Sequence, residues 1–283
     1  MKLWIEGARP KTLIASLSPV LIGSVIAFRM GPFHWGIFFA CALFALAVQI
    51  GTNFANDYID FLKGADTKER KGPRRLVQAG LVTPQKMRLV TFAIFGVAAL
   101  LGFYLMALGG WQIGVLALLA ILFGYLYTGG PYPLGYLGLG DLFVLIFFGP
   151  VAAAGVTYLQ TGLVSPVAIL AGFPPGLLST AILTMNNLRD QKQDQKVGKK
   201  TLPVRFGTTF GKLEFASCIL GAAIIPLLQK VYFPTIGTLF LGIPLIRLVL
   251  KAKKSEELAP LFPKVGQLQI LYTLIFCLSW GNT

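Results

Sequence analysis

The chain has 283 residues, of which 55% are hydrophobic and 13% charged, and its mean hydropathy is +0.71. Soluble domains carry about 25% charged residues, so this composition excludes an ordinary soluble enzyme and predicts one integral membrane domain spanning residues 1–283. The net charge of +14 does not indicate nucleic-acid binding, because the basic residues fall in short loops between apolar segments.

Nine apolar segments follow one another along the chain, each of the length, about 17–25 residues, that crosses a bilayer as a helix. They cover residues 11–28, 35–58, 88–108, 111–128, 141–161, 166–189, 212–229, 232–250 and 265–281. The predicted fold class is therefore all-α: a polytopic membrane protein of about nine transmembrane helices.

The distribution of basic residues predicts the orientation of these helices. Lys2, Arg9 and Lys11 precede the first segment, and positively charged loops face the cytoplasm. With the N-terminus in the cytoplasm, only Arg29 and Lys230 of the 25 Lys and Arg residues fall on the opposite side. The pattern predicts a multi-pass protein of the cell inner (cytoplasmic) membrane, embedded in the lipid bilayer.

Two polar stretches interrupt the apolar pattern at the cytoplasmic ends of the second and sixth segments. Residues 53–67 read NFANDYIDFLKGADT, and residues 187–201 read NLRDQKQDQKVGKKT. Both follow the pattern N-x2-[ND]-x3-D-x3-G-x2-T, which pairs Asn53 with Asn187, Asn56 with Asp190, Asp60 with Asp194, Gly64 with Gly198 and Thr67 with Thr201. Because both copies end helices that run toward the cytoplasm, we expect two parallel pseudo-repeats around a central cavity.

The polar residues of each stretch lie on one face of a helix. Positions 53, 56, 57 and 60 are spaced i, i+3, i+4 and i+7, and this spacing aligns side chains along a helix. Carboxylate and amide oxygens suit Mg²⁺, which also binds phosphate oxygens, and nearby basic side chains suit the phosphate itself. The two stretches therefore predict a site for a magnesium–diphosphate complex that faces the cytoplasm.

The candidate residues form two sets. The predicted metal ligands are Asn53, Asp57, Asp60, Asp66, Asn187, Asp190 and Asp194, of which Asp57, Asp60, Asp190 and Asp194 are the predicted catalytic residues. The predicted diphosphate contacts are Lys63, Arg70, Arg74, Arg75, Lys199 and Arg205. Helix-end capping is the alternative role for the acidic residues, and orientation in the membrane is the alternative for the basic ones.

Longer segments around these stretches carry a family resemblance. NDYIDFLKGADTKERKGPRRLVQAGLVTP and NNLRDQKQDQKVGKKTLPVRFG resemble the two aspartate-rich motifs of the UbiA-type intramembrane aromatic prenyltransferases. The D-x2-D-x5-D spacing of Asp57, Asp60 and Asp66, the Arg70-x-Gly72-Pro73-x-Arg75 segment and the loop YTGGPYPLGYLGLGD are most similar to the branch that prenylates 1,4-dihydroxy-2-naphthoate. The resemblance covers the whole chain.

This resemblance implies a reaction and a cofactor. A prenyl diphosphate and 1,4-dihydroxy-2-naphthoate would give demethylmenaquinol, diphosphate and CO2, with Mg²⁺ ions bridging the diphosphate. Aromatic faces stabilise cations, so aromatic residues near the motifs are expected to shield the allyl cation, and a loop at 128–140 is expected to close over the site. The expected residues of the acceptor and prenyl pocket are Arg9, Lys11, Phe54, Asn56, Tyr125, Tyr127 and Tyr132. Packing is the alternative role for the aromatic residues, and membrane anchoring for Arg9 and Lys11.

Three other functions fit parts of the pattern. The same reaction on 4-hydroxybenzoate, or on an isomeric naphthoate, uses the same motifs. An ion-coupled transporter also has repeats and intramembrane charges, although transport sites lie near the midplane rather than at one end of the helices. A scaffold without catalysis leaves the repeated aspartates without a role. No protein partner is indicated, and the length of the prenyl chain does not follow from the sequence.

Overall fold

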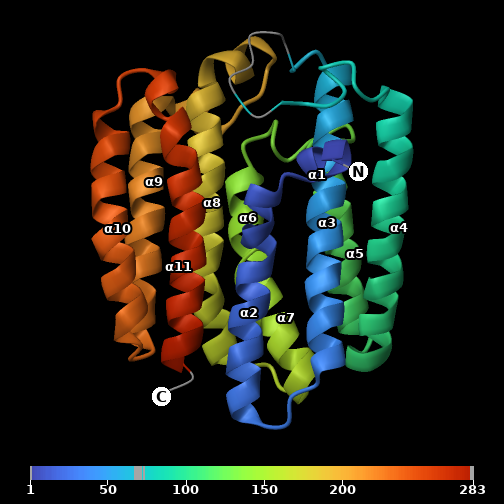
Figure 1. The fold of residues 1–283 in the computed structure, drawn as a ribbon, viewed down its shortest axis with the longest axis vertical. Helices are drawn as coiled ribbons and strands as arrows, with labels where there is room; N and C mark the ends of the chain where they lie inside the picture. Colours follow the sequence, from blue (N-terminus) through green and yellow to red (C-terminus); the bar gives the residue numbers. More distant parts are fainter. Residues whose placement is uncertain (1, 67–71, 73, 281–283) are drawn as a thin grey trace.

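The computed structural model describes residues 2–66, 72 and 74–280, and all of the regular structure in this part of the chain is helical. Figure 1 shows the helices as one bundle with their axes roughly parallel. The helices are α1 (Lys2–Ala8), α2 (Leu13–Met30), α3 (Trp35–Leu62), α4 (Pro84–Gly109), α5 (Trp111–Leu126), α6 (Gly140–Phe147), α7 (Pro150–Thr161), α8 (Pro166–Lys196), α9 (Leu202–Leu228), α10 (Tyr232–Lys251) and α11 (Phe262–Trp280). Short 3-10 turns cover Pro10–Thr12, Ser255–Glu257 and Ala259–Leu261.

The all-α fold class predicted from the apolar segments is confirmed. Eight helical segments in the described part of the chain are long and apolar enough to cross a membrane, and α5, with 16 residues, is a shorter apolar helix. Each predicted span coincides with one of these nine segments. The apolar pattern therefore located every long helix, because burial in lipid and burial in the protein both select apolar side chains.

The fifth predicted span, 141–161, is divided into α6 and α7. Gly149 leaves helical geometry with φ −138° and ψ −115°, and Pro150 begins α7. Proline lacks a backbone N–H and is tolerated in the first turn of a helix. A Cβ built at Gly172 of α8 would lie 2.5 Å from Cα of Pro150. The break thus brings two backbones into contact at a glycine.

Several predicted boundaries differ from the structure, among them the start of α4, which lies at Pro84 rather than at 88. The helices α3 and α8 continue to Leu62 and Lys196, beyond the predicted ends at 58 and 189, because the polar stretches keep their helical spacing. The helix α9 begins at Leu202 rather than at 212, and its first turns are set off by Gly207, with φ 89° and ψ 167°. The acidic stripes therefore stand on the final turns of α3 and α8.

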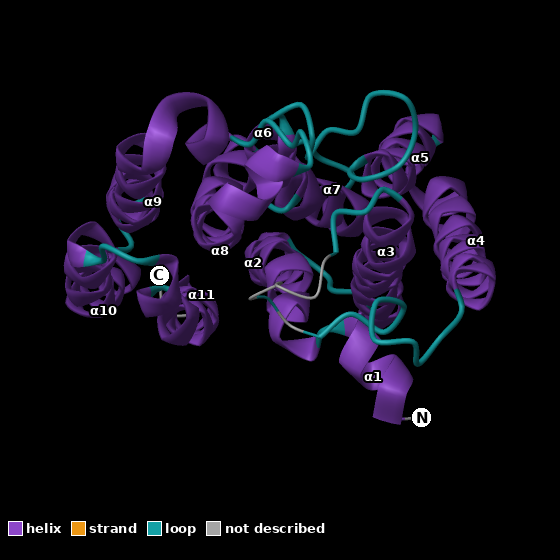
Figure 2. Ribbon diagram, turned by 90° about the horizontal axis from the view of Figure 1, so that it is seen from above, coloured by secondary structure: helices purple, strands orange, loops and turns teal. Residues whose placement is uncertain are grey.

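The bundle has two groups of helices, seen from above in Figure 2. The helices α8 to α11 form one group and α3 to α5 the other, with α2, α6 and α7 between them. Separate cores fill these groups: Phe215, Leu268 and Tyr272 belong to the first core, and Phe54, Met87 and Phe95 to a core in the second. The ends of α3 and α8 that carry the acidic stripes lie at the same end of the bundle (Figure 1).

Candidate active site

Asp60, at the end of α3, is the centre of a buried charged cluster. Asp60 is only 3% exposed, and its Oδ2 lies 3.2 Å from Nη2 of Arg75. Nζ of Lys199 lies 3.2 Å from Oδ1, and the Tyr136 hydroxyl donates to the same oxygen at 2.9 Å. Three segments that are distant in sequence thus meet at one carboxylate.

Lys199 connects the two acidic stretches. Its ammonium nitrogen lies between Asp60 and Asp194, 4.0 Å from Oδ1 of Asp194. A second link joins the segments directly, because Nε2 of Gln193 donates to the carbonyl oxygen of Ala65 at 2.7 Å. The structure therefore brings the ends of α3 and α8 together, as the aligned motifs predicted.

The side chains of Asp57 and Asn53 form hydrogen bonds to backbone groups. Both carboxylate oxygens of Asp57 accept backbone N–H groups, Oδ2 from Leu76 at 2.9 Å and Oδ1 from Val77 at 3.0 Å. Nδ2 of Asn53 donates to the carbonyl oxygen of Ala8 at 2.9 Å. These bonds fix the segments that cover the end of α3, and the metal-ligand role of both residues stays a prediction.

The other predicted ligands have basic partners. Nε of Arg75 lies 3.3 Å from Oδ2 of Asp66, so Arg75 bridges Asp60 and Asp66. Asp190 accepts two hydrogen bonds from its neighbour Arg189, from Nε at 2.8 Å and from Nη2 at 2.6 Å. Asn187 is buried one turn earlier on α8. Sequence reasoning did not select Arg189, because a basic residue beside an acidic one has no periodic signal.

The predicted diphosphate contacts divide between the cluster and the surface. Lys63 donates from Nζ to the carbonyl oxygen of Thr128 at 2.7 Å, and with Arg75 and Lys199 it belongs to the cluster. Arg205 instead donates to the carbonyl oxygens of Lys200 at 3.0 Å and Leu137 at 2.7 Å, so it ties two loops together. Arg74 is exposed. Arg70 lies outside the described residues.

The aromatic residues predicted for the pocket lie in different surroundings. Tyr127 lines an apolar cavity, but Tyr132 is 74% exposed and Phe54 packs in the core with its ring 5.7 Å from that of Trp4. The ring of Tyr125 is tilted against that of Phe92, with ring centroids 5.8 Å apart. Helical spacing in the sequence does not distinguish these cases, because the same aromatic residue types occur in packed cores and in cavity walls.

The polar members of the predicted acceptor pocket also lie outside the cavity wall. Asn56 accepts a hydrogen bond from the hydroxyl of Thr128, and Lys11 is exposed in the turn before α2. Arg9 adopts a left-handed backbone conformation with φ 54° directly before that turn. The structure places all three at the same end of the bundle as the charged cluster, because they adjoin the last turns of α3 or the start of α2.

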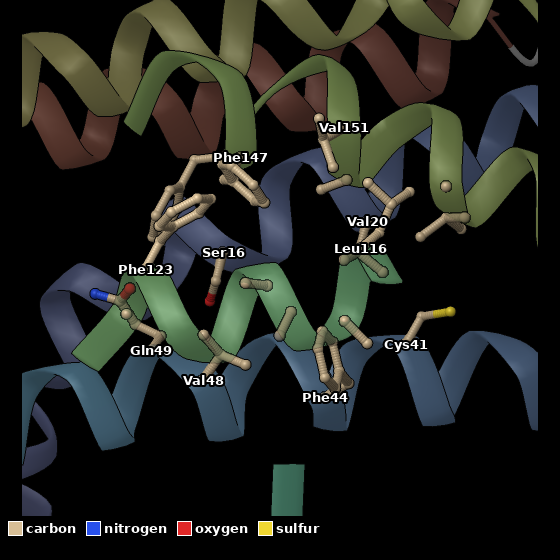
Figure 3. A pocket seen from close by; sticks show the side chains of 18 of the residues that line it. Ser16, Val20, Cys41, Phe44, Val48, Gln49, Leu116, Phe123, Phe147 and Val151 are labelled. Atoms are coloured by element: carbon tan, nitrogen blue, oxygen red, sulfur yellow. The ribbon is translucent and has the colours of Figure 1, made fainter. Parts of the chain in front are cut away.

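An apolar cavity of about 180 Å³ lies among α2 to α7 (Figure 3). Its walls are mainly aliphatic and phenylalanine side chains, including Phe44, Phe123 and Phe147. Its polar lining residues include Gln49 and Thr52 of α3, each one helical turn before Asn53 and Asn56. The cavity therefore lies in the apolar interior and reaches α3 one turn before its polar stretch.

The donor atoms of the cluster are suited to a hard divalent cation, but their arrangement is not a closed metal site. Among the described residues, no three Asp, Glu, His or Cys side chains gather in a group that could hold a metal ion. Asp60 and Asp194 nevertheless face a common point, which Lys199 occupies. Oxygen ligands of this type bind Mg²⁺ together with phosphate oxygens. The residues fit a metal if the Lys199 ammonium moves aside.

Burial shifts the titration of two groups beside the cluster. It lowers the pKa of Lys63, an effect that the charge of Asp60 opposes and the charge of Lys199 reinforces. Burial also raises the pKa of Tyr136, and the nearby carboxylate of Asp60 adds to that rise. The tyrosine hydroxyl thus keeps its proton and remains a hydrogen-bond donor to Asp60.

The comparisons with known proteins agree with this architecture. The model of the UbiA prenyltransferase family matches residues 16–268. A 1,4-dihydroxy-2-naphthoate octaprenyltransferase of Haemophilus influenzae is 34% identical over 294 residues, which covers 99% of this chain and 96% of that protein. The Escherichia coli protein of the same name is 33% identical, with 98% and 94% covered.

A solved structure shares the fold. A UbiA homolog from Archaeoglobus fulgidus bound to DMAPP and Mg²⁺ superposes with a TM-score of 0.63 at 15% identity, covering 97% of this chain and 98% of that one. The family model spans most of the chain, and relatives above 30% identity span nearly all of it. This chain therefore belongs to the UbiA prenyltransferase family.

Proposed function

We propose that this protein transfers a prenyl group from a prenyl diphosphate to 1,4-dihydroxy-2-naphthoate, with a divalent cation, Mg²⁺, as cofactor. Relatives named for this activity are 31–37% identical over most of the chain. The observation that carries the proposal is an apolar cavity that reaches Gln49 and Thr52 of α3, on the same helix whose final turns place Asp60 against Arg75 and Lys199. A prenyl diphosphate has the same two parts, an apolar chain and an anionic head.

The head group would lie against the charged cluster. Asp60, Asp190 and Asp194, with Asn187, are the residues that would hold the metal. When bound, the metal supplies positive charge that stabilises the leaving diphosphate oxygen. Lys63, Arg75 and Lys199 offer further positive charge at the same place, and preorganised charge of this kind lowers the barrier to ionisation.

The reaction then balances without a further reactant. The allylic C–O bond breaks and its electron pair leaves with the diphosphate. The electron-rich naphthoate ring attacks the allyl cation, and the ring carboxylate departs as CO2, which leaves its bonding pair to restore aromaticity. The apolar cavity lined by Phe123, Tyr127 and Phe147 excludes water from the cation, and aromatic faces stabilise it.

The location of the site follows from the charge distribution. The ends of α3, α8 and α10, each followed in the sequence by a basic loop, lie at the same end of the bundle (Figure 1), and such loops remain in the cytoplasm. We therefore place the site at the cytoplasmic face of the cell inner membrane. The apolar product and the prenyl chain then exchange directly with the bilayer.

The test is prenyl transfer by the purified protein in detergent. The assay contains Mg²⁺, octaprenyl diphosphate and 1,4-dihydroxy-2-naphthoate, and it measures the prenylated product and CO2. Activity should be lost with EDTA, return with Mg²⁺, and be lost in Asp60→Ala and Asp194→Ala. Glu256→Ala, which removes an exposed acidic side chain at the same end of the bundle, should retain activity.

Two results would change the conclusion. Product formed only with 4-hydroxybenzoate keeps the mechanism and replaces the acceptor. A folded protein that turns over no prenyl diphosphate with any aromatic acid overturns the proposed function.

A further inference from the structure

Tyr136 lies under two ammonium groups. Nζ of Lys63 is 4.5 Å from the centroid of its ring, and Nζ of Lys199 is 4.8 Å from the same centroid. The first lysine follows α3 and the second follows α8, whereas Tyr136 belongs to the loop between α5 and α6. One aromatic ring thus contacts a basic residue from each acidic stretch.

The tyrosine is fixed at both of its ends. Its hydroxyl donates to Oδ1 of Asp60 at 2.9 Å, and its backbone carbonyl oxygen accepts the N–H of Lys200 at 2.8 Å. The loop is fixed on either side as well, since Lys63 donates to the carbonyl oxygen of Thr128 and Arg205 donates to that of Leu137. The ring is therefore held in place by the protein and does not depend on a ligand for its orientation.

Two ammonium groups at one ring repel each other, and their repulsion must be offset. The face of an aromatic ring carries negative electrostatic potential and attracts cations, and the Asp60 carboxylate lies 3.2 Å from Nζ of Lys199. Each ammonium has three donors, and the carbonyl oxygen of Thr128 takes one from Lys63. A pair of preorganised cations beside the candidate metal ligands matches the charge of a diphosphate.

We propose that Tyr136 is a positioning residue for the leaving diphosphate: its ring holds the Lys63 and Lys199 ammonium groups as a pair, and its hydroxyl orients Asp60. The inference rests on the proposed function, because it assigns the anion to the head group of the prenyl diphosphate. It separates two parts of the side chain, the ring and the hydroxyl, which substitutions can remove independently.

The test compares Tyr136→Phe with Tyr136→Leu. Phenylalanine keeps the ring, so the inhibition constant of inorganic pyrophosphate and KM for octaprenyl diphosphate should stay within about 3-fold of wild type, while kcat falls because Asp60 loses its donor. Leucine removes the ring, so both constants should rise about 10-fold. Tyr232→Leu, which removes a tyrosine ring that is 58% exposed at the start of α10, is the matched control and should leave both constants unchanged.

Several outcomes would overturn the positioning role. Unchanged pyrophosphate inhibition in Tyr136→Leu removes the role of the ring, and an equal rise in Tyr136→Phe shows that the ring is not what holds the lysines. Should Tyr136→Leu not fold, Tyr136→Met refills the volume without a ring and carries the same expectation. If the wild-type protein transfers no prenyl group, the proposed function is wrong. If the wild type is active and Tyr136→Leu has unaltered constants, only the positioning role of Tyr136 is wrong.

Discussion

Oδ2 of Asp57 accepts the backbone N–H of Leu76 at 2.9 Å, across 19 residues of chain. With the second bond from Val77, this carboxylate fixes the turn that follows Arg75. This turn places the Arg75 guanidinium beside Asp60 and Asp66. Two aspartates three residues apart on one helix therefore have separate tasks, since one holds the loop and the other faces the candidate metal site.

Asp57→Asn should destabilise the protein without removing metal–pyrophosphate binding. An amide has one acceptor oxygen, so a buried N–H of the turn loses its partner at a cost of about 1–3 kcal/mol. We expect a lower Tm in detergent, and a retained upward shift of Tm on adding Mg²⁺ and pyrophosphate, because a ligand that binds the folded state stabilises it. In Asp60→Asn that shift should disappear. A shift lost in Asp57→Asn and kept in Asp60→Asn would reverse the two roles.

Asn53 provides a test of the same kind. Its amide donates to the carbonyl oxygen of Ala8 and to the hydroxyl of Thr12, and an aspartate cannot donate these bonds. Asn53→Asp should therefore lower Tm as much as Asn53→Ala, by the equivalent of about 1 kcal/mol, and should leave the Mg²⁺ concentration for half-maximal activity unchanged. If Asn53 ligated the metal, Asn53→Asp would reach half-maximal activity at a lower Mg²⁺ concentration than Asn53→Ala.

Lys63 predicts the alkaline limb of the pH–activity profile. Partial burial lowers its pKa below the ordinary value of 10.5, so its positive charge, and with it diphosphate binding, is lost at a lower pH than for a fully solvated lysine. We expect kcat/KM to fall within that window in the wild type and to hold to higher pH in Lys63→Arg, because a guanidinium remains protonated. An identical alkaline limb in both proteins would assign it to another group.

The same shift has a consequence for stability. Because the folded pKa of Lys63 lies below the unfolded value, the unfolded chain binds more protons between the two values. The free energy of unfolding should therefore rise with pH through this window, and the rise should be smaller in Lys63→Met. Tm measured in detergent across the alkaline range checks the sign.

The cavity predicts an effect on the prenyl chain that spares the head group. Ala45 lines the cavity, and Ala45→Phe should fill part of it. We expect kcat/KM for octaprenyl diphosphate to fall about 10-fold or more, with unchanged inhibition by inorganic pyrophosphate. Leu100→Phe, at a residue 74% exposed on α4, adds an aromatic ring outside the cavity and should be neutral. Equal losses of kcat/KM in both variants would show that the cavity does not bind the prenyl chain.

The sequence by itself determined the features that depend on composition and on short-range spacing. In the described part of the chain, the apolar segments located the eight long helical segments and the shorter α5, because apolar length is what lipid and a packed bundle both require. The helical spacing of the two acidic stretches predicted that their side chains share a face. The alignment of Asp60 with Asp194 predicted their meeting, and Lys199 joins them.

Only the tertiary structure decided which groups the side chains on that helix face contact. Helical spacing gives the angle of a side chain about its own axis, but it does not say which neighbour fills the space opposite. Asp57 meets a turn and Asp60 meets two basic residues, and Tyr136 enters the cluster from a loop 76 residues beyond Asp60. The exposure of Tyr132 and the burial of Phe54 were decided in the same way, by long-range packing that leaves no periodic trace in the sequence.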